Sequence, residues 1–264
     1  MTARTLTCHV ESVEDLTPDV FRVRFAARPE ALAHAPGQYL EMKLDDTTWV
    51  PFSIANAAKG DGVLELHIQH WPERSNSARL RSLLVAANQL ELRLPNGECV
   101  LDLDDPSPVV LICAGTGFSQ MHAMLQAAFA HGLNQPIELW WAARERRDLY
   151  LESAALHWAA SQPNFRYVPV LEEAPEAGDA HHQALEAAGV EASFNGHIGR
   201  IDDALRAHAE SMAGKRVYLS GSPGMVYACV DALTPLGVEA SALSSDVFSY
   251  APREPLLDPA LVSG

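Results

Sequence analysis

The chain has 264 residues, 48% of them hydrophobic, so it can bury a substantial core as one large domain or two ordinary ones. Its formal net charge of −15, from 19 basic and 34 acidic residues, repels phosphate backbones and anionic lipid, so we expect neither nucleic acid nor membrane as a partner. No apolar stretch approaches the roughly 18 residues needed to span a bilayer, and the first residues lack the apolar core of a secretory signal. We therefore expect a cytoplasmic protein.

The spacing of cysteine and histidine residues does not indicate a metal site. The four cysteines, Cys8, Cys99, Cys113 and Cys229, are too far apart for a zinc knuckle or for the close spacing of an iron–sulfur centre. Adjacent histidines at 181 and 182 lie in the polar stretch EAPEAGDAHHQALE, where we interpret them as solvated loop residues. We expect no metal site.

Residues 1–103 have the pattern of an antiparallel β-barrel. Alternating segments at 6–16, 20–27, 37–44, 62–70 and 88–95 are separated by Gly, Pro and Asp turns, and each predicts a strand. Among them lies VPFSIAN (50–56), a strand-like run that holds a proline, an aromatic ring and a hydroxyl in succession. At 75–87, leucines at helical spacing follow Ser and Asn capping residues and predict the one helix. Many short strands with one helix favour a barrel.

Residues 104–252 have the pattern of an α/β domain, which follows a polar connection near 103–107 marked by Pro95, Pro106 and Pro108. A continuous apolar strand is expected at 109–115, and further strands at 137–143, 165–172, 216–221 and 238–244. Helices are expected at 118–132, 148–161, 202–211 and 223–237. This alternation predicts a five-stranded parallel sheet covered by helices on both faces, with residues 253–264 as a C-terminal tail.

Two glycine turns of this second domain are candidate anion-binding sites. In ICAGTGFS, Gly115 and Gly117 let the backbone approach an anion beside free helix N–H groups, although a glycine turn after a buried strand needs no ligand. In LSGSPGMV, Gly221 and Gly224 open a second strand-to-helix turn, and Pro223 stands near the helix start, where its missing N–H costs little. We expect the strands that precede these turns to be neighbours at a topological switch point, where ligands bind in open α/β sheets. The two turns together therefore predict a dinucleotide-binding site.

The last expected element ends in SSDVFSYAP. Its aromatic residues, Phe248 and Tyr250, either form a hydrophobic plug or cover a flat ring at the carboxyl end of the sheet.

Together these segments resemble the ferredoxin-reductase superfamily and look most like its bacterial NAD(P)H:flavin reductase branch. The resemblance spans roughly residues 6–250 and rests on VPFSIAN, ELHIQ, LPNGE, ICAGTGFS, WWAARERRDLY, LSGSPGMV and SDVFSY, in that order. It implies a flavin-binding antiparallel barrel followed by a nicotinamide-nucleotide domain. It also implies hydride transfer from NADH or NADPH to a flavin (riboflavin, FMN or FAD) in the cleft between the domains.

The resemblance also assigns roles to individual residues. In the barrel it implies a flavin-binding strand, whose serine hydroxyl lies close to flavin N5 and whose aromatic residue packs at the ring, formed by Pro51, Phe52 and Ser53. Ser53 is the one catalytic candidate, although a strand serine is more often a surface hydroxyl. A second flavin segment meets the ribityl chain and ring edge through its backbone and comprises His67, Ile68 and Gln69.

In the second domain the resemblance implies four groups of contacts. The pyrophosphate turn is Gly115, Thr116 and Gly117. The turn beside the nicotinamide is Gly221, Ser222, Pro223 and Met225. Arg144 matches a nucleotide contact, and Phe248 and Tyr250 match the tail that shields the flavin.

The sequence departs from the family in its phosphate-binding residues. Val50 replaces the arginine that grips flavin phosphate, and valine cannot substitute for a bidentate cation. A Gly-x-x-Ser helix start for the pyrophosphate is reduced to Ser77, because the glycine is replaced by Arg74; Arg74 and Arg79 either compensate or are solvated charges. These departures indicate a weakly held flavin, or one recognised by its ring and ribityl chain. Two others, Ser220 for cysteine and Gln120 for proline, leave the chemistry in place.

Three functions remain open at this point. The leading one is an oxidoreductase that uses flavin as a dissociable substrate and releases reduced flavin to a partner protein. The second is a reductase component with bound FAD or FMN that passes electrons to a separate ferredoxin or oxygenase. The third is a non-catalytic, nucleotide-binding electron-transfer subunit.

The choice between the two nicotinamide nucleotides is also open. Three arginines after the second parallel strand, Arg144, Arg146 and Arg147, are candidates for binding a 2′-phosphate. Glu145 lies among them and is a candidate for binding a ribose hydroxyl instead.

Overall fold

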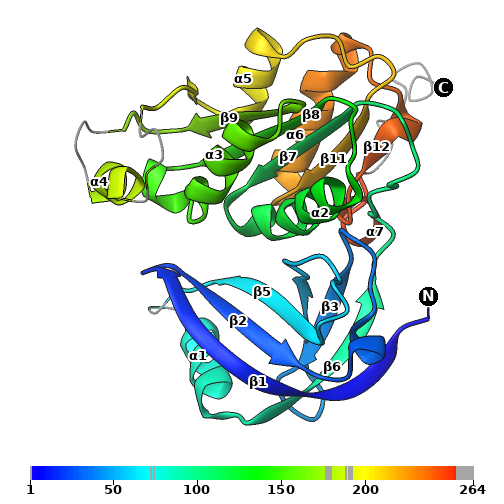
Figure 1. The fold of residues 1–264 in the computed structure, drawn as a ribbon, viewed down its shortest axis with the longest axis vertical. Coiled ribbons are helices and arrows are strands. Elements are labelled where there is room, and N and C mark those ends of the chain that lie inside the picture. Colours follow the sequence, from blue (N-terminus) through cyan, green and yellow to red (C-terminus); the bar gives the residue numbers. More distant parts are fainter. Residues whose placement is uncertain are drawn as a thin grey trace, which may run out of the picture.

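Two six-stranded sheets, one above the other in Figure 1, organise the chain. The computed structural model describes residues 2–71, 73, 75–175, 180–187, 189 and 193–253. The tail expected at 253–264 lies outside this part apart from Arg253, as do Arg74 and the side chain of His182. Within the described residues, no helix has both the length and the apolar character to cross a bilayer.

The first sheet confirms the antiparallel architecture expected for the first half of the chain. Its strand order is β4-β3-β6-β1-β2-β5, and every pairing is antiparallel. The strands are β1 (Arg4–Thr17), β2 (Val20–Ala26), β3 (Tyr39–Lys43), β4 (Trp49–Ser53), β5 (Val63–Gln69) and β6 (Gln89–Asn96). Just beyond β4, the Ala55 N–H donates to the Glu65 carbonyl of β5 at 2.8 Å, which brings the two edges of the curved sheet together.

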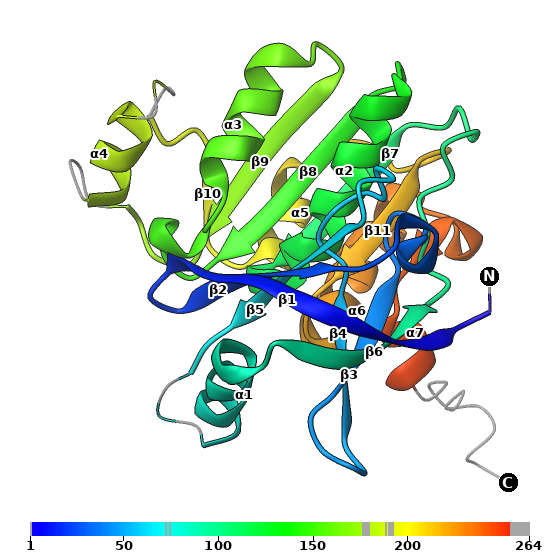
Figure 2. The ribbon, with the colours of Figure 1, turned by 60° about the horizontal axis from the view of Figure 1, so that its bottom comes forward.

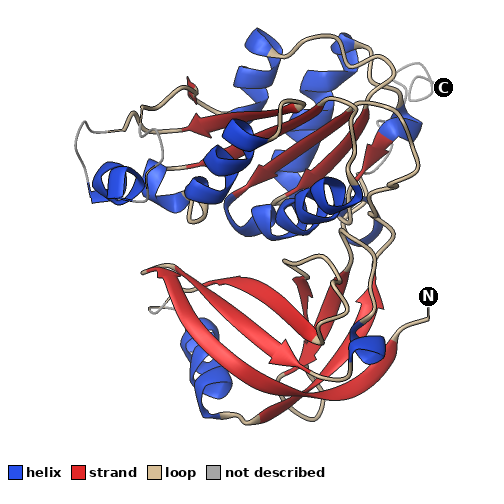
Figure 3. Cartoon of the chain, in the orientation of Figure 1, coloured by secondary structure: helices blue, strands red, loops and turns tan. Residues whose placement is uncertain are grey.

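Alternating side chains fill the interior of this barrel. On β2, Phe21, Val23 and Phe25 are fully buried while the arginines between them point outward, as a period of two requires. The α-helix α1 (Ser75–Ala86) lies beside the barrel and contributes Leu84 to its core (Figure 3). A short 3-10 helix spans Pro29–Leu32.

The second sheet is parallel and has the order β10-β9-β8-β7-β11-β12. Its strands are β7 (Val109–Ala114), β8 (Ile137–Ala143), β9 (Phe165–Leu171), β10 (His197–Ile198), β11 (Arg216–Ser220) and β12 (Leu243–Ser244). The five expected strands are present. The sixth, β10, has only two residues and is too short to leave a periodic pattern. Strand β12 is shorter than the expected 238–244, because Ala240–Ala242 form a 3-10 turn.

Helices cover both faces of this sheet, as expected. They are α2 (Phe118–His131), α3 (Glu152–Ser161), α4 (Ala180–Ala187), α5 (Ile201–His208), α6 (Pro223–Leu233) and α7 (Val247–Tyr250). Alternate residues of β7 divide between two cores: Leu111 packs in the core that includes α2 and α3, and Ile112 in the core that includes α5 and α6. Figure 2 shows α2 and α3 on one side of the strands and α5 and α6 on the other.

Several sequence expectations about helices are wrong in detail. The helix expected at 148–161 begins at Glu152, after a 3-10 turn at Arg146–Asp148, and the helix expected at 202–211 spans Ile201–His208. Helix α6 ends at Leu233 rather than at 237, since Pro235 has no N–H to continue it and Thr234–Leu236 form a 3-10 turn instead. His181 is not a solvated loop residue. It lies on α4, and its Nε2 is 2.8 Å from a carboxylate oxygen of the buried Glu152, which also pairs with Arg146.

The two glycine turns meet at one place on the sheet. Strand β7 lies between β8 and β11, so the strand order reverses between β7 and β11, and both turns follow the carboxyl ends of these neighbours. A Cβ on Gly117 would lie 2.4 Å from the Ser220 carbonyl oxygen, whereas a Cβ on Gly115 (φ +52°) would meet no atom within 4 Å. Gly117 therefore serves the close packing of the turns, and Gly115 faces open space.

The connection between the two sheets runs from the end of β6 at Asn96 to the start of β7 at Val109. Cys99 and Leu101 of this connection pack in the core of the second sheet. The division at residue 103 stays a prediction.

Packing of the two turns gives a stability prediction. The change Gly117→Ala should lower the free energy of unfolding by about 1–3 kcal/mol, because its Cβ overlaps the Ser220 carbonyl. Gly224→Ala is the matched control, since a Cβ there meets nothing within 4 Å and should leave stability equal or slightly higher. Chemical denaturation of both variants checks this; equal stabilities would contradict the close-packing role of Gly117.

Candidate active site

Three adjoining hollows lie where the two domains meet. The central cavity, of about 500 Å³, is lined by barrel residues that include Pro51, Phe52 and Ser53 and by second-domain residues that include Gly117, Gly221 and Tyr250. The α1 cavity, of about 960 Å³, lies between α1 and the strands β4 and β5 and shares Phe52 and His67 with the central cavity. The sheet groove, of about 680 Å³, runs over the carboxyl ends of the parallel strands and shares Ala114 and Ser222 with the central cavity.

Ser53 has the chemistry expected of a ligand contact. It ends β4, at a position paired with Tyr39, and it lines the central cavity. Among the described residues, none forms a hydrogen bond with its hydroxyl. A partly exposed hydroxyl that faces a cavity with no protein partner is available to a bound molecule.

The α1 cavity holds the residues near which a flavin phosphate was expected. Val50, Ser77 and Arg79 all line it. The Ser77 hydroxyl accepts a hydrogen bond from the Trp71 N–H at 2.8 Å. Arg79 is the one cation among the residues that line this cavity in the described part of the chain; it is 74% exposed and 4.0 Å from Asp45. A phosphate in this cavity would therefore meet little fixed positive charge.

Both glycine turns border the space between the domains. Thr116 and Gly117 line the central cavity, and Gly115 lines the sheet groove. The 3-10 turn Gly115–Gly117 runs directly into α2, whose first N–H, that of Phe118, donates within the turn. No side chain caps the start of the turn itself, which leaves its N–H groups for an anion. At the second turn, Ser222 caps α6 by accepting a hydrogen bond from the Met225 N–H at 3.3 Å.

The two aromatic residues of the last element have different places. Tyr250 is 65% exposed and lines the central cavity. Phe248 is not among the residues that line the cavity; it packs against Tyr227 with ring centroids 5.9 Å apart. Tyr250 thus has the position of a ring cover, while Phe248 has that of a hydrophobic plug. Pro223 likewise lines none of the three hollows and occupies the first turn of α6.

The remaining predicted residues are brought to the same region. Ile68 lines the α1 cavity, Gln69 lines the α1 cavity and the sheet groove, and Arg144 and Met225 line the sheet groove. The His67 side chain has no exposed surface, so the part of His67 that faces the cavities is main chain, as the sequence resemblance implies.

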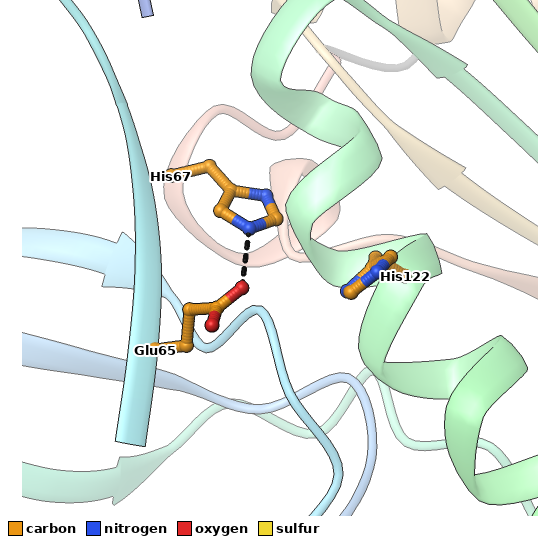
Figure 4. Close-up of side chains that lie close together, drawn as sticks. All are labelled: Glu65, His67 and His122. Atoms are coloured by element: carbon orange, nitrogen blue, oxygen red, sulfur yellow. Dashed lines mark hydrogen bonds and ion pairs between the residues drawn. The ribbon is translucent and has the colours of Figure 1, made fainter. Parts of the chain in front are cut away.

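The His67 side chain instead joins the two domains. It belongs to an interdomain polar cluster formed by Glu65 and His67 of β5, His122 of α2 and Tyr150. Figure 4 shows the first three of these side chains. His67 Nε2 lies 2.8 Å from Glu65 Oε1, and His67 Nδ1 lies 3.1 Å from the Tyr150 hydroxyl. From α2, His122 Nδ1 donates to the Ala55 carbonyl at 2.6 Å.

One potential ligand atom each from Glu65, His67 and His122 lies within 4.8 Å of the other two. These side chains are nevertheless engaged by protein groups, since Arg24 pairs with Glu65 at 3.0 Å, Tyr150 with His67 and Ala55 with His122. The cluster is therefore complete as a hydrogen-bonded contact between domains.

Burial sets the protonation states in this cluster. It lowers the pKa of His122 to about 4, with a contribution from the neighbouring His67, and it lowers the pKa of His67 as well. Burial opposes ionisation of Glu65, but the hydrogen bonds of Glu65 with His67 and Arg24 outweigh burial and hold its pKa below the ordinary value. At neutral pH the cluster therefore has two neutral imidazoles and a carboxylate paired with Arg24.

Sequence reasoning missed Asp246, which lies in the central cavity with Ser53 and Tyr250. Burial raises the pKa of its carboxyl to about 6, although Gln120 donates a hydrogen bond to it at 2.9 Å. The available signal was an acidic residue two positions after the last parallel strand, within SSDVFSYAP. A carboxyl with this pKa exchanges a proton readily near neutral pH.

Comparisons with known proteins agree with this arrangement. A family model described as an oxidoreductase FAD-binding domain matches residues 7–100, and one described as an oxidoreductase NAD-binding domain matches residues 111–231. The chain is 31% identical to reductase component 1 of terephthalate 1,2-dioxygenase from Comamonas sp., over 94% of this chain and 70% of that protein. It is 28% identical to an NAD(P)H-flavin reductase of Vibrio harveyi, over 82% of this chain and 86% of the relative.

Among solved structures, the cytochrome P450 reductase of Amycolatopsis superposes with a TM-score of 0.75 and 30% identity, over 91% of this chain and 68% of that protein. The chain is thus an oxidoreductase with a FAD-binding and an NAD-binding domain. It belongs to the ferredoxin-reductase superfamily.

The residues present fit a flavin ring better than a flavin phosphate. Three side chains border the central cavity: a hydroxyl with no hydrogen-bond partner among the described residues (Ser53), an aromatic ring shared by two cavities (Phe52) and an exposed aromatic cover (Tyr250). The open side of Gly115 and the uncapped start of the turn Gly115–Gly117 fit a nucleotide pyrophosphate.

The interdomain cluster gives a pH prediction. Between pH 6.5 and about 4 the unfolded chain binds more protons than the native His122, so stability should fall as pH decreases through this window, by on the order of 2–3 kcal/mol from this group. His122→Gln should flatten the dependence, and the exposed His157→Gln should leave it as in the wild type. Denaturant unfolding at pH 7.0, 5.5 and 4.5 measures it. If the His122→Gln variant lost as much stability at low pH as the wild type, His122 would not be the cause of the pH dependence.

Proposed function

We propose that this chain is an NAD(P)H:flavin oxidoreductase that takes flavin as a dissociable substrate and releases reduced flavin to a partner protein. One observation carries the proposal: the flavin-type strand with Ser53 and both nucleotide-type glycine turns line a single cavity between the domains. When both rings are bound there, hydride transfer between nicotinamide and flavin is the chemistry that they supply.

The residues of the chain have orienting and protonating tasks in this proposal. Ser53 presents a free hydroxyl to the ring, and Tyr250 keeps water from one side of the cavity. Asp246 holds or releases a proton at its carboxyl, and Gln120 fixes its orientation by also donating to the Gly37 carbonyl at 2.6 Å. Hydride transfer between two cofactor rings requires no further acid–base pair.

Weak retention of flavin is the part of the proposal that rests on the α1 cavity. Val50 lines it where the resemblance implies an arginine, and the exposed Arg79 is the only cation among its described lining residues. A cavity without a bidentate phosphate partner binds the ring and ribityl chain but adds little for a phosphate.

The second candidate is a reductase component with bound FAD or FMN that delivers electrons to an oxygenase or ferredoxin. It is favoured by the similarity over nearly the whole chain to the Comamonas reductase component. We further propose a cytoplasmic location, which agrees with the four cysteines being free and buried.

The two candidates differ in how flavin behaves during purification. Absorbance of the purified protein after dialysis, with steady-state kinetics against riboflavin, FMN and FAD, separates them. A protein that is colourless after dialysis and turns over added flavin supports the dissociable-substrate function, and a protein that stays yellow supports the reductase component. Nucleotide binding without oxidation of NADH or NADPH would favour a non-catalytic subunit.

Ser53→Ala tests the proposed hydroxyl contact. Loss of the hydroxyl should slow single-turnover hydride transfer by roughly tenfold, which is about 1.4 kcal/mol of transition-state stabilisation, while nucleotide affinity stays near the wild-type value. Stopped-flow absorbance measures the transfer, and calorimetry measures binding. An unchanged transfer rate would exclude the hydroxyl from the reaction.

Val50→Arg tests the α1 cavity. A cation at this position should tighten FMN and FAD by roughly tenfold while riboflavin, which has no phosphate, changes little. Val85→Arg is the matched control, because it adds the same charge at an exposed position of α1. Fluorescence titration gives the affinities; equal gains for all three flavins would refute the account of Val50.

A further inference from the structure

The described lining of the sheet groove includes arginines that could bind the 2′-phosphate that distinguishes NADPH from NADH. It joins the central cavity at Ala114 and Ser222 and extends away from Ser53 over the ends of β8, β9 and β10, which lie side by side in Figure 2. If the nicotinamide bound at the central cavity and the pyrophosphate at Gly115, the far end of the groove would receive the adenosine. Three arginines line that end: Arg144, Arg147 and Arg200.

Each of these arginines already has a carboxylate partner. Arg144 Nε lies 2.7 Å from Glu173 Oε1, and the Glu173 N–H donates to the Arg144 carbonyl at 2.9 Å, which holds the two residues side by side. Arg147 lies 2.9 Å from a Glu145 carboxylate oxygen.

The remaining two arginines of this region are also engaged. Arg200 lies 3.1 Å from the buried Asp202. Arg146, the third arginine of the sequence motif, is buried against Glu152 at 2.9 Å and does not line the groove. No guanidinium that lines the described part of the groove therefore lacks a carboxylate.

Negative charge exceeds positive charge in the same groove. Its described lining includes the three arginines and five carboxylates, Asp19, Glu145, Asp148, Glu172 and Asp202. Three of these carboxylates, Asp19, Asp148 and Glu172, have no described cation within ion-pair distance. A dianionic 2′-phosphate would meet this excess, whereas a ribose 2′-hydroxyl can donate a hydrogen bond to a carboxylate.

We propose that the adenosine end of the groove selects NADH over NADPH, and that Glu145 and Glu173 determine this specificity by occupying Arg147 and Arg144. The proposal rests on the proposed function, because it takes the groove as the nucleotide site. Glu173 and Glu145 lie 2.7 and 2.9 Å from these arginines, so each carboxylate also places a negative charge where a 2′-phosphate would bind. Removing both carboxylates removes that repulsion and leaves the two arginines for a phosphate.

Calorimetric titration with NAD⁺ and with NADP⁺ tests the proposal without turnover. The wild-type protein should bind NAD⁺ at least about tenfold more tightly than NADP⁺. The double variant Glu145→Gln/Glu173→Gln should tighten NADP⁺ by roughly tenfold and change NAD⁺ by less than about threefold. The control Glu14→Gln/Glu91→Gln removes two carboxylates from ion pairs of the barrel, with Arg22 and Lys43, and should leave the preference as in the wild type.

Equal or tighter binding of NADP⁺ by the wild type overturns the preference, as does failure to bind either nucleotide. An unchanged NADP⁺ affinity in the double variant, or an equal gain in the control, overturns the assignment to Glu145 and Glu173. A protein that prefers NAD⁺ but reduces no flavin leaves the inference standing and rejects the proposed function, so the two failures are distinguishable.

Discussion

Docking of α2 onto the barrel is the contact on which the site depends. The helix packs its apolar side, which includes Met121 and Leu125, into the core of the second sheet. Three of its polar side chains make hydrogen bonds across the domain boundary, Gln120 to Gly37, His122 to Ala55 and Gln126 to the Ala57 N–H. Because buried polar groups are costly when unpaired, these bonds favour one relative placement of the domains, and that placement brings Ser53 to face the glycine turns.

Much of the fold could be predicted because its signals are local. Strands such as β2 alternate with period two, and β7 is a continuous apolar run between a proline connection and a glycine turn. Elements without such a signal could not be predicted. Strand β10 has only two residues. Helix α4 lies in a polar stretch without apolar periodicity, and the contact of its His181 with Glu152 joins residues far apart in the sequence. The predicted end of α6 was wrong because Pro235 interrupts the backbone hydrogen bonds of the helix.

The candidate site was predictable where it follows motifs and not where it depends on contacts between distant segments. The serine of VPFSIAN and the glycines of both turns are recognisable in the chain and line the same hollows. Asp246 is partly buried beside Gln120, which lies 126 positions away in the sequence. No local sequence pattern predicts this contact. The choice between Arg144 and Glu145 likewise could not be read from WWAARERRDLY, because Glu173, the partner of Arg144, belongs to the end of another strand.

The core under the second sheet has a consequence for how the molecule unfolds. It contains Val20 from the barrel and Cys99 and Leu101 from the connection, packed with Met124 of α2. These apolar residues belong to both halves of the chain, so exposing either half would expose part of the other's interior. The two domains should therefore lose structure in one cooperative transition, and a fragment cut between the sheets would carry an uncovered apolar surface.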